Sequence, residues 1–279
     1  MTNLNERIGL HSWTLDTTPL PVVLSIAREA GYNAVELRHT DFKRCIEAGM
    51  SNAEVLAMIR ASGIKVSCMG LESGMLFARG DEQQRLFDSM EEMCARAAAL
   101  DCEVMMVAPG TNPAGTVQDA ARNFAAGGEI ARKHGLRCAL EFSSGHPVVN
   151  RLAVAREIVA LANQPNCGLL IDTYHAQRMG DGGRGFEDVP ASDIVAFQFS
   201  DVPPGPITGT GTPLDRLPPG KGVVRWREVL RLLMEKGYDG YINYEAPNPA
   251  HWSRPPMEVA REGVTLIRAL LVDAAAAAR

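Results

Sequence analysis

Several features are missing from this sequence, and each absence narrows the function. None of its 279 residues belong to an uninterrupted apolar run of about 18, the length that a transmembrane helix needs, so we expect no membrane span. The N-terminus, MTNLNERIGLHSW, has no basic region followed by a long apolar segment, so we expect no signal peptide. Aromatic residues make up only 6%, and the formal net charge is −5. A net negative charge argues against a general binder of nucleic acid.

The cysteines lack the spacing of a metal or redox motif. None of the six forms a C-x-x-C pair, and several lie inside apolar, strand-like runs. We therefore expect buried free thiols in a reducing compartment, the cytoplasm.

What the sequence does contain is an alternation of short apolar runs with amphipathic segments. Such alternation predicts strands that pair in parallel, each followed by a helix. The eight predicted strands span residues 7–13, 34–40, 65–71, 103–109, 137–143, 167–173, 194–201 and 240–246. Eight units predict an α/β fold, a (β/α)8 TIM barrel, forming one domain over residues 1–279. The main alternative is an open doubly wound sheet, but no glycine-rich phosphate-binding turn follows the first strand.

The segments between the strands have helical spacing of apolar residues. We expect helices over residues 20–31, 51–63, 81–101, 118–135, 149–164, 225–237 and 256–279. Ser51 with Glu54 three residues later predicts a capping box. The longest irregular segment, residues 201–222, follows the seventh strand, so we expect it to lie over the mouth of the barrel.

The last four predicted strands are apolar until their C-terminal ends, where one polar side chain appears on each. In a barrel these ends meet at one face, so the four side chains can converge. Three carboxylates in one cavity repel strongly unless a cation neutralises them. The oxygen-only donor set predicts one divalent metal ion, Mn²⁺, Mg²⁺ or Co²⁺. The predicted ligands are Glu141, Asp172, Gln198 and Glu245.

Histidines near these strand ends are candidates for substrate binding. His175 follows Asp172 by three residues, a spacing that returns its ring toward the same cavity. His146 lies in the loop after Glu141, and His11 and Trp13 end the first strand and are candidates for the pocket wall. Glu36 and Arg38 are either pocket residues or an internal ion pair.

The segments LEF, IDTYHAQR, FQFSD and LDRLPPGKGVVRWREVLRLLMEKGYDGYINYEA resemble the sugar phosphate isomerase/epimerase family, with its xylose isomerase-like TIM barrel. The resemblance implies one metal ion on Glu141, Asp172, Gln198 and Glu245. It implies that Glu141 and Glu245 transfer protons, that His175 binds a substrate oxygen, and that Arg216 closes over the substrate. It also implies a homo-oligomer, a dimer or a tetramer. Where the family's epimerases have histidine this chain has Gln198, which resembles the 3-dehydroshikimate dehydratases of the superfamily.

The chemistry so implied is proton abstraction next to a carbonyl group, with a metal ion stabilising the ene-diolate charge. Our primary hypothesis is an isomerase or epimerase of a small ketose or related hydroxyketone sugar. The alternative is a dehydratase of a cyclic hydroxyketone such as 3-dehydroshikimate or an inosose. A DNA-repair endonuclease of the superfamily needs a histidine cluster and a basic face, whereas the six histidines here are mostly dispersed. A noncatalytic sugar-binding barrel need not keep both glutamates.

Overall fold

The strands form a closed parallel barrel. The computed structural model describes residues 3–112, 114–205 and 214–276. Neighbouring strands pair in chain order from β1 to β8, and β8 pairs with β1. This confirms the predicted (β/α)8 barrel, and each strand lies within its predicted range. The strands are β1 Ile8–His11, β2 Ala34–Arg38, β3 Lys65–Gly70, β4 Val104–Val107, β5 Arg137–Glu141, β6 Cys167–Asp172, β7 Ile194–Phe199 and β8 Ile242–Tyr244.

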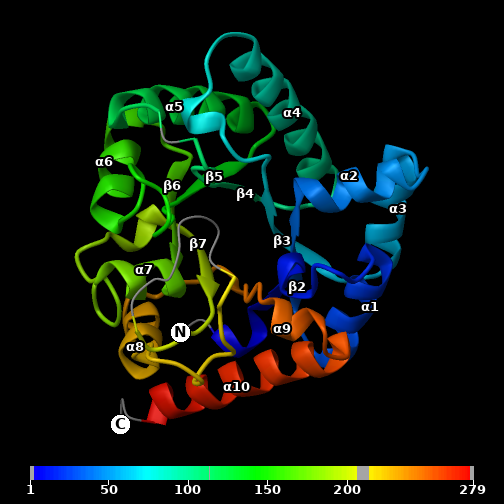
Figure 1. Cartoon of the computed structure of the whole chain (residues 1–279), viewed down its shortest axis with the longest axis vertical. Helices are drawn as coiled ribbons and strands as arrows, with labels where there is room; N and C mark the ends of the chain where they lie inside the picture. The colour runs from blue at the N-terminus through cyan, green and yellow to red at the C-terminus, as the bar shows by residue number, and fades with distance from the viewer. Residues whose placement is uncertain (1–2, 113, 206–213, 277–279) are drawn as a thin grey trace.

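The helices surround this barrel (Figure 1). The long C-terminal helix α10 packs along α8 and α1 on one side. In the described chain, none of the helices is long and apolar enough to cross a membrane. The helices are α1 Leu20–Ala30, α2 His39–Glu47, α3 Asn52–Ala61, α4 Gly80–Ala99, α5 Val117–Lys133, α6 Leu152–Ala162, α7 Thr173–Met179, α8 Trp226–Glu235, α9 Pro249–Trp252 and α10 Pro256–Ala276, with short 3₁₀ turns η1 Leu4–Glu6, η2 Ser12–Leu15, η3 Met75–Phe77 and η4 Ala191–Asp193.

Local sequence signals explain where several helices begin and end. The predicted capping box of α3 is present: the Ser51 hydroxyl accepts from the Glu54 amide, and the Glu54 carboxylate accepts from the Ser51 amide. Helix α1 ends at Gly31, whose φ of 93° is a conformation that glycine adopts without strain. The second predicted strand ran two residues too far, because His39 begins α2. The Asp41 carboxylate accepts from the Arg38 amide there and starts the helix.

The segment after β7 is organised by one buried carboxylate. Asp201 accepts hydrogen bonds from the backbone amides of residues 202, 220 and 224 and from the indole of Trp226. It also pairs through its backbone with Leu217 in an antiparallel bridge. This bridge returns the chain to the barrel just after Arg216. Residues 206–213 of the predicted mouth-covering loop lie outside the described residues.

Candidate active site

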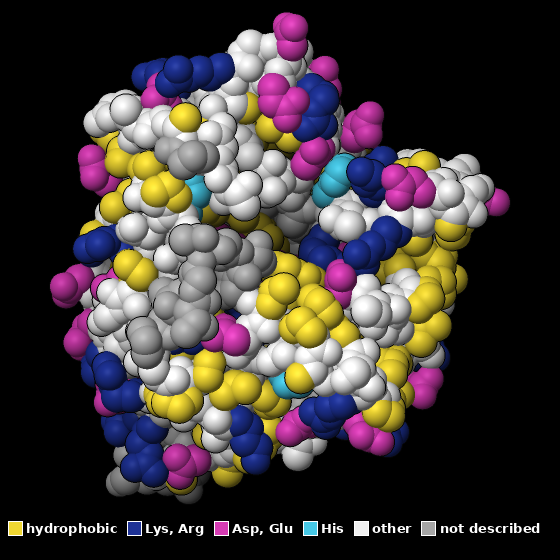
Figure 2. Space-filling view, viewed as in Figure 1, with side chains coloured by type: hydrophobic (Ala, Val, Ile, Leu, Met, Phe, Trp, Pro, Cys, Tyr) yellow, Lys and Arg dark blue, Asp and Glu magenta, His cyan; other side chains and the backbone are white. Residues whose placement is uncertain are grey.

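A cavity of about 560 Å³ opens among the C-terminal ends of the strands and the loops that follow them. Figure 2 shows a hollow near the centre of this face, with Lys and Arg side chains along one margin. The residues that carry its charge or imidazole groups are His11, Arg38, His39, Glu72, Glu141, His146, His175, Arg216 and Glu245.

Three carboxylates gather at the C-terminal ends of the strands, and two of them, Glu141 and Glu245, line this cavity. Glu141 ends β5, Asp172 ends β6, and Glu245 follows β8; all three are buried. The pKa of Glu141 is raised well above its usual range by burial, and further by the neighbouring charges of Glu245 and Asp172. Burial also raises the pKa of Glu245, and the Arg216 guanidinium opposes that rise. The barrel therefore brings together the acids that the strand ends predicted.

Arg216 is the cation that these acids face. Its guanidinium is buried, and its Nη1 lies 2.6 Å from Asp172 Oδ2 and 2.9 Å from Glu245 Oε2. The guanidinium also stacks over the ring of Tyr174, 4.7 Å from the ring centroid. Arg216 thus lies among the acids rather than at the outer rim.

His175 lies within reach of two of the acids. One possible ligand atom from each of Glu141, Asp172 and His175 lies within 4.8 Å of the others. The backbone amide of Ser144 donates to His175 Nδ1 over 3.0 Å, and Arg216 Nη2, which can only donate, lies 3.1 Å from His175 Nε2, so each ring nitrogen faces a donor. Burial lowers the pKa of this imidazole to about 3, so it is neutral. A neutral imidazole accepts at only one ring nitrogen, so Ser144 and Arg216 compete for the lone pair of His175.

Gln198 has a different arrangement at the two ends of its amide. Its Nε2 donates to Glu36 Oε1 over 2.9 Å, while its Oε1 is buried and has no hydrogen-bond partner among the described residues. Glu36 is therefore a buried partner of Gln198 and not the ion-pair partner of Arg38, which instead pairs with Asp16 and Asp41. Burial, and secondarily the charge of Glu245, raises the pKa of Glu36 to about 8.

His11 lies next to Glu245. Its Nδ1 accepts from the Trp13 amide, so its Nε2 carries the proton and lies 3.4 Å from Glu245 Oε1. The imidazole is fully buried. It contacts Glu245 and, like Trp13, is among the residues that line the cavity, as predicted. Trp13 lines the cavity as predicted, with the Arg38 guanidinium 5.7 Å from its ring centroid.

His146 lines the cavity with its hydrogen-bonding capacity already used. Its Nδ1 accepts from the amides of Val148 and Val149, and its Nε2 lies 3.0 Å from the Asn112 carbonyl. The ring stacks on Phe77 at a centroid distance of 5.2 Å. This corrects the expectation for His146: its ring contributes shape to the wall, and no ring nitrogen is left for a substrate hydroxyl.

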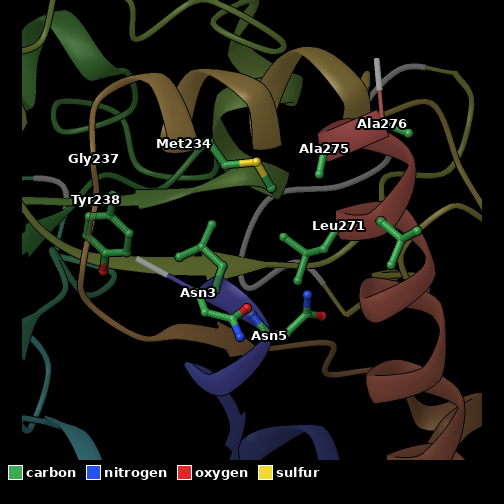
Figure 3. A pocket seen from close by; sticks show the side chains of 10 residues that line it. Asn3, Asn5, Met234, Gly237, Tyr238, Leu271, Ala275 and Ala276 are labelled. Atoms are coloured by element: carbon green, nitrogen blue, oxygen red, sulfur yellow. Dashed lines mark hydrogen bonds between the residues drawn. The ribbon is translucent and has the colours of Figure 1, made fainter. Parts of the chain in front are cut away.

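A second hollow, of about 540 Å³, lies between α8, α10 and the N-terminal segment (Figure 3). Asn3, Asn5, Met234, Tyr238 and Leu271 are among the residues around it. No carboxylate, imidazole, thiol or cationic side chain is among its lining residues, so this second hollow lacks the usual groups for acid–base chemistry.

The donor set at the barrel mouth fits a divalent cation. Glu141 Oε1 and Gln198 Oε1 are buried without a hydrogen-bond partner in the described chain. Buried polar atoms are nearly always partnered, so unpartnered oxygens beside several carboxylates indicate a ligand that supplies positive charge. Carboxylate and amide oxygens are what Mg²⁺ and Mn²⁺ prefer.

Sequence reasoning missed two supporting residues. Ser144, whose backbone amide donates to His175 Nδ1, carries no motif, because its role depends on a contact between residues 31 positions apart. Tyr174, which lies under Arg216, looks in sequence like an ordinary helix residue.

A closed (β/α)8 barrel with this cluster of acids and histidine at its C-terminal mouth defines an enzyme of the TIM-barrel class. The chain belongs to the xylose isomerase-like TIM barrel family, whose sequence model matches residues 24–270.

Individual relatives point to two reactions. An inosose isomerase of Halalkalibacterium halodurans is 27% identical over 248 residues, which are 86% of each chain. A 3-dehydroshikimate dehydratase of Pseudomonas aeruginosa is 26% identical over 253 residues, 88% of this chain but only 39% of that protein. Among solved structures, the IolI protein with a bound zinc atom superimposes with a TM-score of 0.83 at 22% identity, over 96% of this chain and 98% of that one.

Proposed function

We propose that this protein is a divalent-metal-dependent isomerase or epimerase of a small ketose or related hydroxyketone sugar. The observation that carries the proposal is the pair Glu141 and Glu245, two buried carboxylates on one cavity, both with raised pKa values. A carboxyl group with a raised pKa holds a proton more readily than an ordinary carboxyl group, so it can both accept and return one. The inosose isomerase relatives, which match across most of their length, support the same reaction type.

Each residue of the site would have a separate role in the reaction. Glu141 and Glu245 move the proton, and His175 binds a substrate oxygen. Arg216 balances the charge of Asp172 and Glu245 at distances of 2.6 and 2.9 Å. A divalent ion, for which Glu141, Asp172, Gln198 and Glu245 are the proposed ligands, would supply electrophilic stabilisation of the developing negative charge. Manganese, magnesium and cobalt are the proposed ions.

We propose further that the substrate carries no phosphate. Arg38 and Arg216 are the only Lys or Arg side chains that line the described cavity, and each already pairs with two carboxylates. Residues 113 and 206–213 include no Lys or Arg in the sequence. A phosphate ester would therefore enter this cavity without an unpaired Lys or Arg side chain to receive it.

A dehydratase is the second candidate, because of the glutamine at position 198 and the dehydratase relatives. The two reactions share proton abstraction and differ in the next step. An isomerase returns the proton to carbon, whereas a dehydratase expels a β-hydroxyl group.

One experiment tests these proposals together. The protein is incubated in D₂O with Mn²⁺ and a panel of inososes, free ketoses, their phosphate esters and 3-dehydroshikimate. Deuterium incorporation without loss of water supports the isomerase, and an absorbing conjugated product supports the dehydratase. Turnover that persists after verified removal of metal would contradict the metal-dependent mechanism. Faster turnover of a phosphate ester than of its free sugar would contradict the charge argument.

Two further expectations remain predictions. We propose a cytoplasmic location, which the six free cysteines support, because oxidising conditions favour disulfides. We also propose a homodimer or homotetramer, which light scattering coupled to size-exclusion chromatography would measure.

A further inference from the structure

Glu36 is a buried carboxylate to which the proposed reaction assigns no role. It lies on β2, in register with His11 on β1, and it is fully buried. It accepts a hydrogen bond from a side chain across the barrel, that of Gln198 on β7, 162 residues away. Burying an acid costs free energy unless the acid is hydrogen-bonded or paired. The long-range partner Gln198 therefore indicates which residue Glu36 acts on.

The contact with Glu36 decides which end of the Gln198 amide remains free. An amide has a nitrogen that only donates and an oxygen that only accepts, and only the oxygen can bind a cation. Gln198 Nε2 donates to Glu36 Oε1 over 2.9 Å. The oxygen at the other end is buried and has no partner among the described residues.

We propose that Glu36 is a positioning residue that holds the nitrogen end of the Gln198 amide, so that the amide oxygen is the atom left to bind the divalent ion. This inference rests on the metal-dependent function proposed above. A histidine ligand binds through a ring nitrogen and needs no choice between amide ends. Glutamine at this position needs an acceptor for its amide nitrogen, and Glu36 is that acceptor.

Glu36 also lies near a second proposed ligand. The protonated Nε2 of His11 lies 3.8 Å from Glu36 Oε1 and 3.4 Å from Glu245 Oε1. One imidazole N–H therefore lies near both carboxylates. Groups behind metal ligands typically change metal affinity about 10- to 100-fold when they are altered.

The test measures binding of Mn²⁺ alone to metal-free protein, by the electron paramagnetic resonance signal of the free ion. Wild type is compared with E36Q, E36D, Q198A and the double variant E36Q/Q198A. We expect E36Q to bind Mn²⁺ at least about tenfold more weakly, since a glutamine can present either a donor or an acceptor to Gln198. E36D keeps the charge but withdraws the carboxylate from Gln198, and we expect a loss of similar size. In the Q198A background, E36Q should add less than about twofold.

The control is E72Q, which removes one negative charge from the rim of the same cavity without touching Gln198. Glu72 pairs instead with Arg85 and lies 3.9 Å from His39. We expect its Mn²⁺ affinity to stay within about twofold of wild type. Urea unfolding of each metal-free variant checks that it is folded. If E36Q does not fold, E36D provides the measurement of the Glu36 effect.

The outcomes separate this inference from the function on which it rests. If wild-type protein binds no Mn²⁺, the proposed metal-dependent function fails and this inference with it. If wild type binds Mn²⁺ while E36Q and E36D bind it equally well, only the role of Glu36 fails. An E36Q effect that is the same with and without Gln198 would mean that Glu36 does not act through Gln198, which also overturns the inference.

Discussion

Asp172 and Asp201 are both fully buried carboxylates near the C-terminal ends of adjacent strands, yet they are partnered differently. Asp201 accepts hydrogen bonds from three backbone amides and one indole, which fill both of its oxygens. Asp172 accepts from one backbone amide, that of Tyr174, and its other oxygen faces Arg216. The first carboxylate is satisfied by the fold itself, and the second depends on a charged side chain.

The same contrast extends to the groups around them. His146 is held by the backbone at both ring nitrogens, like Asp201. Glu141 Oε1 and Gln198 Oε1 have no hydrogen-bond partner among the described residues. Buried polar groups that the backbone satisfies stabilise the fold, whereas those left unpartnered are available for a ligand. The two groups should therefore respond to substitution in opposite ways.

The largest effect is expected at the unpartnered carboxylates. E141Q and E245Q remove the group that accepts or returns the proton, so we expect turnover to fall by at least about 10³-fold. The stability of E141Q should stay the same or rise, because this change removes one of several repelling charges, whereas E245Q also loses the ion pair with Arg216 and should be less stable. Deuterium exchange measures the first effect and urea unfolding the second.

The control for these variants is E29Q, on the outer surface of α1, where Glu29 accepts a hydrogen bond from Ser25. It should change neither turnover nor stability appreciably. Near-wild-type exchange in both cavity variants would remove the proton-transfer roles.

A large loss of stability is expected instead at Asp201. In D201N, one end of the side chain becomes an NH₂ group facing N–H donors, so buried donors lose their acceptor. We expect the free energy of unfolding to fall by about 3 kcal/mol, measured by urea unfolding. D239N changes an exposed acid in the turn before β8 and should stay within about 0.5 kcal/mol of wild type. A D201N protein as stable as wild type would contradict the distinction between the two kinds of buried acid.

The sequence predicted the barrel well because its strands are buried on both faces. A strand such as β7, in which every residue is buried, reads as an apolar run bounded by turn residues. Helices α2 and α9 were not predicted. Each begins with a capping side chain, from Asp41 and Asn248 respectively, a signal that was present but short.

The candidate site was only partly predictable, because the strand ends specify which residues meet and not how they orient. Parallel strands require Glu141, Asp172 and Glu245 to share one face, which the sequence pattern indicates. The orientation of the His175 ring depends on Ser144 and Arg216, and that of the Gln198 amide depends on Glu36. Such contacts join distant residues through single hydrogen bonds, and no spacing rule in the sequence encodes them.

The smallest predicted effect concerns His146 and depends on pH. Burial lowers the pKa of its imidazole, and the Asn112 carbonyl only partly opposes this. Protonation at Nδ1 would break the hydrogen bonds from the Val148 and Val149 amides. In the unfolded chain the pKa of this imidazole is about 6.5. Below that pH the unfolded state therefore binds a proton that the folded state does not bind. Stability from this group is therefore complete above about pH 6.5 and is lost as the pH falls.

H146N tests this directly, because an asparagine oxygen accepts from the same amides but does not titrate. Between pH 6.5 and 5.5 we expect wild type to lose up to about 1 kcal/mol more unfolding free energy than H146N. Urea unfolding at pH 7.5, 6.5 and 5.5 measures the difference, which should be constant across the upper interval and grow across the lower one. A constant difference over the whole range would mean that the backbone does not hold His146 in its neutral form, and His146 would then no longer belong with Asp201 among the side chains that the fold itself satisfies.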